Sequence, residues 1–351
     1  MDERSLKNAT AAIAAWYAEN RRELPWRQEK DPYRIWISEI MLQQTRIEAV
    51  IPYYKRFLQE LPDVYALAAV PEDRLLKLWE GLGYYSRARN LKRAAEKIIS
   101  EYGGLMPRTA AELKQLPGIG DYTAGSIASV AFGEPAPAVD GNVMRVMMRL
   151  AACSDDVMDP KNRRNIMQQL LAVYPEGDQA ALLTEGLMEL GERVCLPNGA
   201  PLCSGCPVAD LCEAHRKGEE LAYPVRTTKK ERRIEHKTVL LLRCGDRFAL
   251  QKRPDKGILA GLWGFPVIEG ALTEEEIAAF FRKERLSYTR IVPCGNAKHV
   301  FTHVEWHMTG WMAECRDMTD AFVWVTPYEL QSGYSVPTAF QYYKKIVLQN
   351  L

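Results

Sequence analysis

Four cysteines gather in one short stretch of this 351-residue chain. Cys195, Cys203, Cys206 and Cys212 are separated by seven, two and five residues. Four soft thiolate ligands so close together predict a metal centre, because a compact helical core has no need of them. Zinc held by four cysteines is one alternative, although zinc motifs more often pair two Cys-x2-Cys units and this stretch contains one.

Two carboxylates lie in contrasting settings. Glu39 stands among the apolar residues of the stretch 35–41, where burial would raise its pKa and keep it protonated. A surface glutamate on an amphipathic helix is the simpler alternative for it. Asp140 comes just before a helical pattern, so its simplest role is a helix N-cap, beside which a carboxylate stays ionised.

A glycine-rich turn joins two helical patterns at Leu116-Pro117-Gly118-Ile119-Gly120. Gly118 and Gly120 let backbone amides approach an anion closely, and the following helix N-terminus adds a favourable dipole. We therefore predict a hairpin that grips the phosphates of one nucleic-acid strand without reading its sequence. A plain corner between two helices is the alternative.

The elements that must hold these residues are helical up to about residue 192. Ala9, Ile13, Trp16 and Tyr17 share one helix face. Similar periods occur, mostly between proline or glycine breaks such as Pro52, in the stretches 35–60, 72–80, 86–102, 109–116, 122–132, 142–150 and 161–174.

The character of the chain changes after the cysteines. The basic run from Arg226 to Lys237 indicates a polar linker, with a direct phosphate track as the alternative. A Thr-x-x-Glu capping box opens a predicted helix over 273–283. Strand-like runs follow the linker at 238–243, 248–252, 299–306 and 322–325. We predict a mostly α domain over 1–222, a linker over 223–235 and an α+β domain over 236–351.

Composition excludes little beyond this. A net charge of +1 leaves nucleic-acid binding open, because only the contact face must be basic. No apolar segment has the length of a signal peptide or membrane span, so we expect a cytoplasmic protein. The cysteines are then not a disulfide framework. Four are scattered and are interpreted as small buried hydrophobes or surface thiols: Cys153, Cys244, Cys294 and Cys315.

The hairpin, followed by an aspartate twenty residues later, resembles the helix–hairpin–helix DNA glycosylase superfamily. The segments 37–45 (ISEIMLQQT), 25–27 (PWR) with Tyr33, and 81–90 (GLGYYSRARN) look like its MutY-type adenine glycosylase branch. With the second domain, the resemblance covers nearly the whole chain. It implies a base excision repair enzyme, acting as a monomer at the bacterial nucleoid, that removes adenine opposite 8-oxoguanine or guanine in duplex DNA.

The resemblance also implies catalytic roles. Glu39 is the general acid at adenine N7, Asp140 stabilises the oxocarbenium-like sugar, and Tyr122 and Asn142 assist. Two carboxylates in different environments can perform both tasks, as in glycosidases. Bifunctional relatives such as endonuclease III carry a Schiff-base lysine where this chain has Tyr122, so we predict base removal without lyase chemistry.

The target base lies in a duplex stack and must be flipped out. Gln44 and Tyr84 resemble the residues that family members insert near the oxidised guanine. Gly118 and Gly120 hold the strand. The other predicted contacts are Leu42, Thr45 and Leu82 beside the inserted residues, and Trp26, Arg27 and Glu185 around the extruded adenine. For Leu42 and Leu82, ordinary packing is an equal alternative.

The family's metal centre is a [4Fe–4S] cluster held by four cysteines, Cys195, Cys203, Cys206 and Cys212 here. The first spacing in the family is usually six residues, so this chain has one residue more, within a Pro/Gly-rich loop.

The segment 259–266 resembles the family's Nudix-like domain. Gly270 and Glu276 start the hydrolytic Nudix pattern, but the positions from Glu284 on do not complete it, so we expect binding without hydrolysis. Phe301-Thr302-His303 matches the family's Phe-Ser-His loop for 8-oxoguanine, with threonine replacing serine. An alternating strand in which His303 is packed is the alternative.

Two other functions stay open. One is a bifunctional endonuclease III-like glycosylase/lyase, disfavoured by Tyr122 and by the extra domain. The other is a non-catalytic iron–sulfur protein that binds DNA damage, disfavoured because Glu39 and Asp140 are both present.

Overall fold

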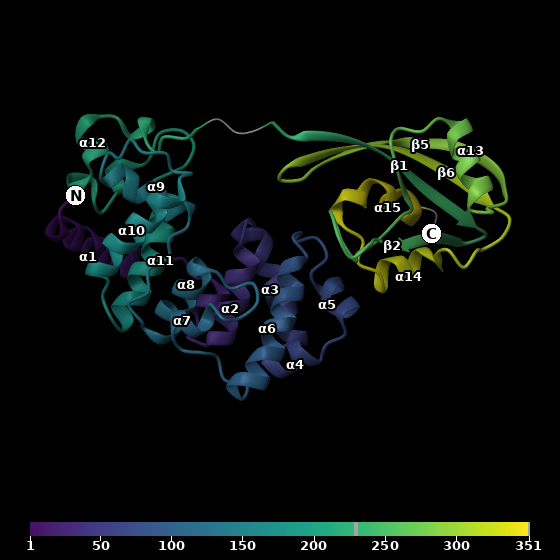
Figure 1. Ribbon diagram of the computed structural model, residues 1–351. Helices are drawn as coiled ribbons and strands as arrows, with labels where there is room; N and C mark the ends of the chain where they lie inside the picture. The colour runs from purple at the N-terminus through teal and green to yellow at the C-terminus, as the bar shows by residue number, and fades with distance from the viewer. Residues whose placement is uncertain (228–230, 350–351) are drawn as a thin grey trace. The chain divides into compact units, whose positions relative to one another are not determined.

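A computed structural model describes residues 1–227 and 231–349, which form two units. Residues 228–230, part of the predicted linker, and 350–351 lie outside the described residues. The first unit is helical and consists of 1–70 and 89–227. The second unit contains the sheet and combines 231–349 with the segment 71–88, which interrupts the first unit in sequence (Figure 1).

Helices make up almost all regular structure before the cysteine loop. Their bounds are α1 (Glu3–Asn20), α2 (Pro32–Leu42), α3 (Ile47–Glu60), α4 (Val64–Ala69), α5 (Glu72–Leu78), α6 (Ser86–Tyr102), α7 (Ala110–Leu113), α8 (Asp121–Phe132), α9 (Gly141–Leu150), α10 (Pro160–Val173), α11 (Asp178–Arg193) and α12 (Glu213–Lys217). Short 3-10 turns are Pro25–Arg27, Cys203–Gly205, Ala209–Leu211 and Glu220–Ala222. The predicted helical half is thus confirmed.

The prediction was wrong around residues 43–52. The expected run 35–60 is two helices, because α2 ends at Leu42 and α3 begins at Ile47. Pro52 lies inside α3 and does not end it. Tertiary packing overrides the proline there, since Val50, Tyr54 and Phe57 are all buried on one face of the helix.

The core of the helical unit lies between α1, α9, α10 and α11. Ile13 and Tyr17 of the predicted α1 face are buried, and Trp16 is partly buried. Most residues of helix α2 are buried. The one polar residue among them, Ser38, satisfies its hydroxyl by donating to the backbone oxygen of Ile35 at 2.8 Å. Packing of this apolar helix against α8 fixes the position of Glu39.

The hairpin has a helix on each side, as predicted. A capping box at Thr109 starts α7, and Gly120 is the N-cap of α8. Gly118 adopts a φ of +80°, and a Cβ there would lie 2.6 Å from Cβ of Asn90. Glycine is therefore required at this turn for both conformation and space.

The second unit is built on a mixed sheet with strand order β3-β2-β1-β6-β5. The strands are β1 (Arg233–Cys244), β2 (Arg247–Lys252), β3 (Trp263–Gly264), β4 (Val267–Glu269), β5 (Tyr288–Val300), β6 (Val304–Cys315) and β7 (Val323–Val325). The long strands β1 and β6 run parallel, β4 pairs with β1, and β7 pairs with β2. This α+β unit agrees with the predicted fold class.

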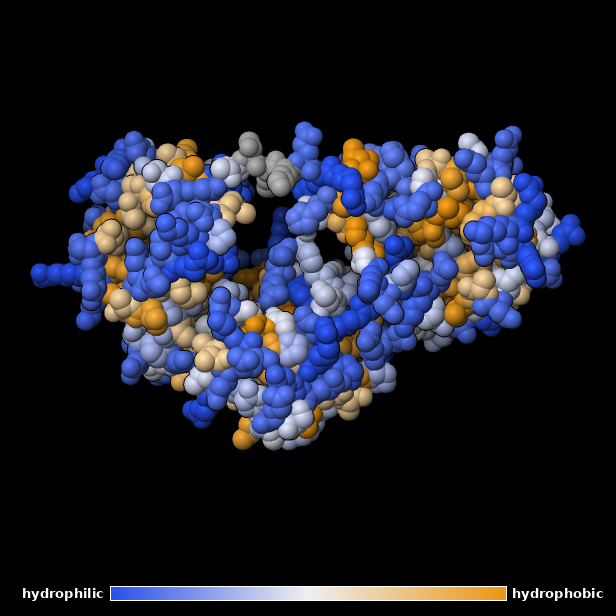
Figure 2. All heavy atoms as spheres, viewed as in Figure 1, coloured by the Kyte–Doolittle hydropathy of each residue, from blue (hydrophilic) through white to orange (hydrophobic). Residues whose placement is uncertain are grey.

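Both faces of the sheet are covered. Along β1, Val239 and Leu241 belong to one core cluster, whereas Leu240 and Leu242 belong to another on the opposite face. The first cluster packs on α15 (Gln341–Leu348) near α14 (Pro327–Ser332), and the second packs on α13 (Glu274–Lys283). In the face seen in Figure 2, hydrophilic residues cover most of the surface and hydrophobic ones form scattered patches.

Two sequence predictions for this unit had different outcomes. The capping box at Thr273 is formed and starts α13, as expected. The predicted strand over 299–306 was wrong, because Phe301, Thr302 and His303 form the turn between β5 and β6. The backbone amide of Phe301 donates to the carbonyl of Val304 at 2.8 Å and closes this turn. Thr302 and His303 are exposed, so a packed His303 is also wrong.

No helix in residues 1–227 or 231–349 combines the length and the apolar character that a membrane crossing requires.

Candidate active site and cysteine loop

One cavity of the helical unit, with a volume of about 130 Å³, collects most of the predicted site. The predicted residues that line it are Trp26, Arg27, Glu39, Leu42, Thr45, Tyr122, Asp140, Asn142 and Glu185. Five further lining residues were not predicted: Leu24, Ile47, Met188, Glu189 and Glu192. Residues from Leu24 to Glu192 thus meet around one hollow.

Glu39 reaches this cavity from the apolar helix α2. Burial, the largest influence, raises the pKa of Glu39 to about 7. The carboxylates of Glu185 and Asp140 add to the increase, whereas the hydroxyls of Ser126 and Tyr122 oppose it. Oxygen Oε2 of Glu39 is buried and has no hydrogen-bond partner among the described residues. The group is therefore about half protonated at neutral pH, and one of its oxygens is available for a new hydrogen bond.

Asp140 is the N-cap of α9, as the simplest interpretation of the sequence had it. Its Oδ1 accepts from the amide of Val143 at 2.7 Å, and its Oδ2 accepts from Nδ2 of Asn142 at 3.0 Å. Burial is the largest influence and raises the pKa of Asp140 above its usual value, against these hydrogen bonds and the charge of Arg145. The expected effect of the helix N-terminus is present, but burial outweighs it.

Tyr122 interacts electrostatically with both carboxylates. Its hydroxyl donates to the sulfur of Met188 at 3.5 Å. Burial and the nearby carboxylates of Glu39 and Asp140 raise the pKa of Tyr122 well above its ordinary value, so it remains a neutral donor. Among the described residues that line this cavity there is no lysine.

Ion pairs hold part of the cavity wall. Arg27 donates from Nη2 to Glu189 at 2.9 Å, and its Nε lies 3.4 Å from Oε1 of Glu185. Burial, the largest influence, would raise the pKa of the fully buried Glu189, but its bonds to Arg22 and Arg27 lower it. Burial does raise the pKa of Glu185. Glu189 could have been found from its spacing, one helical turn after Glu185.

Trp26 completes that wall. Its ring packs edge to face on Tyr54, with centroids 5.3 Å apart, and is almost fully buried. It gives the cavity a rigid aromatic side, which suits a flat heterocycle.

The two predicted inserting residues share a rare backbone. Gln44 and Tyr84 have φ of 59° and 47°, the left-handed region that non-glycine residues seldom adopt. Both side chains are exposed. Nothing in their residue types signals this conformation. Leu82, by contrast, is buried, which favours the packing alternative for it.

Tyr84 belongs to the same unit as the 301–303 turn. Its hydroxyl lies 3.3 Å from Oγ1 of Thr302. The ring of Phe301 anchors the turn, since it lies 4.9 Å from the ring of Trp306 and 4.6 Å from that of His299. The turn therefore presents Thr302 and His303 outward.

The four clustered cysteines are brought together as predicted. Their thiols interact electrostatically with one another, and all four cysteines are partly buried. Arg149 donates to Sγ of Cys195 at 3.2 Å. Four soft donors in one place fit an iron–sulfur cluster.

A second donor set overlaps the first. Cys203, His215 and Glu220 offer ligand atoms within 4.8 Å of one another. Nδ1 of His215 and Oε1 of Glu220 are 2.5 Å apart, so these two groups already satisfy each other.

The loop between Cys195 and Cys203, which is one residue longer than usual in the family, lies at the surface. The amide of Leu202 donates to the carbonyl of Val194 at 2.9 Å and returns the chain to its start. The intervening residues 197–200 are exposed, and Gly199 has a φ of +76°.

Arg145 links this loop to the cavity, which the sequence did not suggest. It donates from Nε to the carbonyl of Cys195 at 2.8 Å and from Nη2 to Oδ1 of Asn142 at 2.8 Å. Asn142 in turn bonds Asp140. A Cβ on Gly191 would lie 2.6 Å from Cβ of Asn142, so the link depends on a glycine.

Comparison with protein families gives two matches. Residues 37–175 match the HhH-GPD superfamily of base excision DNA repair proteins, and residues 238–345 match the NUDIX domain. The first match contains Glu39, Tyr122 and Asp140.

Two solved structures resemble the helical part. A thermostable thymine-DNA glycosylase aligns with a TM-score of 0.55 and 29% identity over 61% of this chain and 98% of its own. An endonuclease III in a non-covalent complex with DNA aligns with a TM-score of 0.52 and 26% identity over 62% of this chain and 98% of its own.

Curated relatives extend over both units. Mouse adenine DNA glycosylase is 34% identical, with 84% of this chain and 68% of the relative covered. The human protein of that name is 33% identical, and the match spans 64% of its length. That of Buchnera aphidicola subsp. Baizongia pistaciae is 32% identical, with 83% of this chain and 82% of the relative covered. The chain therefore belongs to the adenine DNA glycosylase family of base excision repair enzymes.

Proposed function

We propose that this protein flips adenine out of duplex DNA where it is mispaired with 8-oxoguanine or guanine, and hydrolyses its bond to deoxyribose without cutting the strand. The observation that carries the proposal is the Glu39 carboxyl. It has a pKa of about 7 and a buried oxygen without a partner in the described structure, inside the cavity that Asp140 also lines.

The chemistry divides between the two carboxylates. Glu39 donates its proton to N7 of the departing adenine, which makes the base a better leaving group. As the bond breaks, positive charge develops on the sugar, and the Asp140 carboxylate, oriented by Val143 and Asn142, stabilises it. Tyr122 assists as a neutral hydroxyl near both carboxylates.

Binding of the base uses another part of the cavity wall. Adenine lies against Trp26, while Arg27, held by Glu185 and Glu189, contacts its ring edge. The cavity has no lysine among the described lining residues, so no side chain there forms a Schiff base with the sugar. This supports a monofunctional enzyme.

Recognition of the opposite base falls to the exposed residues Thr302 and His303 of the second unit, which read 8-oxoguanine. Gln44 of the first unit and Tyr84 of the second fill the space left by the adenine. The enzyme would then work as a monomer on the bacterial nucleoid.

Cys195, Cys203, Cys206 and Cys212 would hold a [4Fe–4S] cluster. When bound, the cluster ties the ends of the loop together by iron–thiolate bonds. Arg145 and Arg149 of α9 also bind this loop, through hydrogen bonds to the carbonyl and the sulfur of Cys195. Iron and sulfide analysis with visible absorbance, beside zinc analysis, decides between the two metals.

The test is release of adenine from duplexes that hold A opposite 8-oxoguanine, G or C, with Glu39→Gln as the inactive control. We expect release opposite 8-oxoguanine and G, little opposite C, and none with the variant. Borohydride trapping of a strong covalent adduct would identify a lyase instead. Tight binding without release from any duplex would identify a damage-binding protein.

A further inference from the structure

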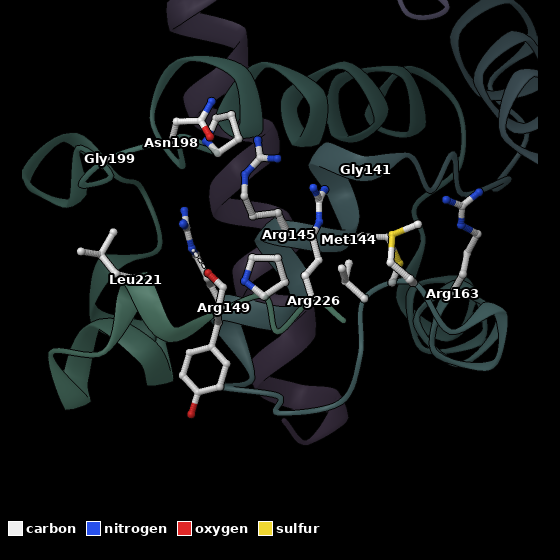
Figure 3. Close-up of a pocket in the computed structure, with 14 residues that line it drawn as sticks. Gly141, Met144, Arg145, Arg149, Arg163, Asn198, Gly199, Leu221 and Arg226 are labelled. Carbon is white, nitrogen blue, oxygen red and sulfur yellow. Dashed lines mark hydrogen bonds between the residues drawn. The ribbon is translucent and has the colours of Figure 1, made fainter. Parts of the chain in front are cut away.

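A second cavity of the helical unit has no role in the chemistry above. It has a volume of about 440 Å³ and lies beside the cysteine loop (Figure 3). Four arginines line it: Arg145, Arg149, Arg163 and Arg226. The lining residues that the structure describes include no acidic side chain. Such a pocket attracts an anion.

The four arginines come from three separate elements. Arg145 and Arg149 project from α9, Arg163 from the first turns of α10, and Arg226 from the start of the predicted linker. In the view of Figure 3 their guanidinium groups follow one another in the order Arg149, Arg145, Arg226, Arg163. The fold therefore gathers charges that the sequence places far apart.

Two of these arginines are already engaged. Arg145 bonds Cys195 and Asn142, and Arg149 bonds Cys195 and the carbonyl of Tyr223 at 2.9 Å. Both are buried and form the floor of the pocket. Arg163 and Arg226 are exposed and supply the charge that can reach a ligand.

One carboxylate lies near the rim. Asp156 interacts with Arg226 electrostatically, but its oxygens accept from the amide of Met158 at 2.9 Å and from the hydroxyl of Thr227 at 2.7 Å. One such group does not balance four arginines. The surplus positive charge of the pocket remains.

The position of the pocket indicates its ligand. Gly141 lines it, while the neighbouring residues Asp140 and Asn142 line the catalytic cavity. The two hollows thus lie on either side of the N-terminus of α9. A strand whose adenine enters the catalytic cavity continues past this point, with one phosphate per nucleotide.

We propose that this arginine pocket binds a backbone phosphate of the DNA strand that carries the target adenine, through Arg163 and Arg226. The assignment rests on the proposed function for the choice of strand. It changes the interpretation of Arg226, which the sequence favoured as a linker charge with a phosphate track as the alternative. The buried residues Arg145 and Arg149 connect the pocket to the cysteine loop through their hydrogen bonds to Cys195.

The experiment compares Arg163→Gln, Arg226→Gln and the double variant with Arg164→Gln. Arg164 is the next residue of α10, is also exposed, and is not among the pocket residues, so it is a matched control. Affinity for an undamaged duplex is measured by fluorescence polarisation over a series of KCl concentrations. The visible absorbance of the metal centre and the melting temperature verify that each variant is intact.

We expect the double variant to bind about tenfold more weakly at moderate salt. The slope of log K against log[KCl] should fall by about 1, the effect of one lost phosphate contact. Arg164→Gln should keep both the slope and the single-turnover rate of the unaltered protein. An unchanged slope in the double variant, or an equal loss in the control, overturns the proposal.

Inorganic phosphate separates DNA from a free phosphate ligand. Phosphate could raise the melting temperature of the unaltered protein at fixed ionic strength but not that of the double variant. If the DNA slope of the double variant is then also unchanged, the pocket binds a free anion and the DNA assignment is wrong. Because the duplex is undamaged, failure of adenine release by the unaltered protein would reject the proposed function and leave the salt slopes as evidence on the pocket.

Discussion

The hydroxyl of Tyr84 lies 3.3 Å from the hydroxyl of Thr302, although 218 positions of sequence separate the two residues. They meet because the segment 71–88 belongs to the unit that contains the sheet. The residue proposed to enter the DNA stack and the residue proposed to read the opposite base are therefore mechanically connected. A substitution at Tyr84 or Thr302 should therefore affect the proposed role of the other residue.

Removal of the Thr302 hydroxyl should reduce discrimination between 8-oxoguanine and guanine. Thr302→Val keeps the shape and loses the hydrogen bond to Tyr84, which is worth about 1 kcal/mol, or a few-fold in the ratio of the two dissociation constants. Thr302→Ser keeps the hydroxyl and should retain the ratio. Binding titrations with an uncleavable adenine analogue opposite each base measure it. An equal loss in the serine variant would show that the methyl group, and not the hydroxyl, matters.

The buried ion pair of Glu80 and Lys344 should hold the segment 71–88 on the second unit. Nζ of Lys344 donates to Oε1 of Glu80 at 2.6 Å, and the amide of Val336 donates to the same oxygen at 3.1 Å. Lys344→Met removes one of two lysines that pair with Glu80, since Nζ of Lys77 lies 2.6 Å from its Oε2, so we expect a loss of about 1 to 2 kcal/mol in unfolding free energy. Chemical denaturation of the full chain measures it.

Two comparisons make that result specific to the pair. Lys345→Met removes the neighbouring exposed lysine and should change stability by less than about 0.5 kcal/mol. Glu80→Gln combined with Lys344→Met should cost less than the sum of the single changes. Additive losses would mean that the two side chains act independently.

Gly191→Ala should disturb catalysis through Asn142. The new Cβ would lie 2.6 Å from Cβ of Asn142, closer than any real contact, so Asn142 must shift away from Asp140. We expect single-turnover adenine release to fall about tenfold or more, while the absorbance of the metal centre is retained. Gly205→Ala, whose Cβ meets nothing within 4 Å, is the control. A normal rate in the Gly191 variant would remove Asn142 from the proposed machinery.

The sequence predicted the elements better than their junctions. Apolar periods located most helices, but the same alternation of Val300, Val304 and Trp306 fits one continuous strand or two strands of a hairpin, and only the hydrogen bond from Phe301 to Val304 decides. Likewise Pro52 signals a break, and the buried face of α3 overrides it. Local patterns do not contain the long-range packing that settles such cases.

For the site, residue types were predictable and conformations were not. Glu39 and Asp140 could be chosen from their neighbours and the family resemblance, yet the pKa of Asp140 rises because distant elements bury it. Arg145 reaches Cys195 across 50 positions, and Gln44 and Tyr84 carry no sequence signal for a left-handed backbone. Each of these features arises from tertiary contacts.

Above neutral pH the proton on Glu39 should control the rate. With a pKa of about 7, the acid form predominates below pH 7 and falls tenfold per pH unit well above it. Single-turnover adenine release should therefore decline through pH 7 to 9 with a slope approaching −1. A flat profile over this range, with the cluster intact, would mean that another group supplies the proton.

The same group should weaken the fold where it is ionised. A glutamate in the unfolded chain titrates near 4.5, so the raised folded value means that the native state binds the proton more tightly. This contribution to stability is complete below pH 4.5 and is lost as pH rises through 7, by up to about 3 kcal/mol. Glu39→Gln should thus gain stability over the unaltered protein as pH rises from 5 to 8 and gain almost nothing near pH 4. Glu48→Gln, at an exposed position, should show no such trend. If the Glu39 variant tracks the unaltered protein across this range, the carboxyl ionises freely and cannot be the acid.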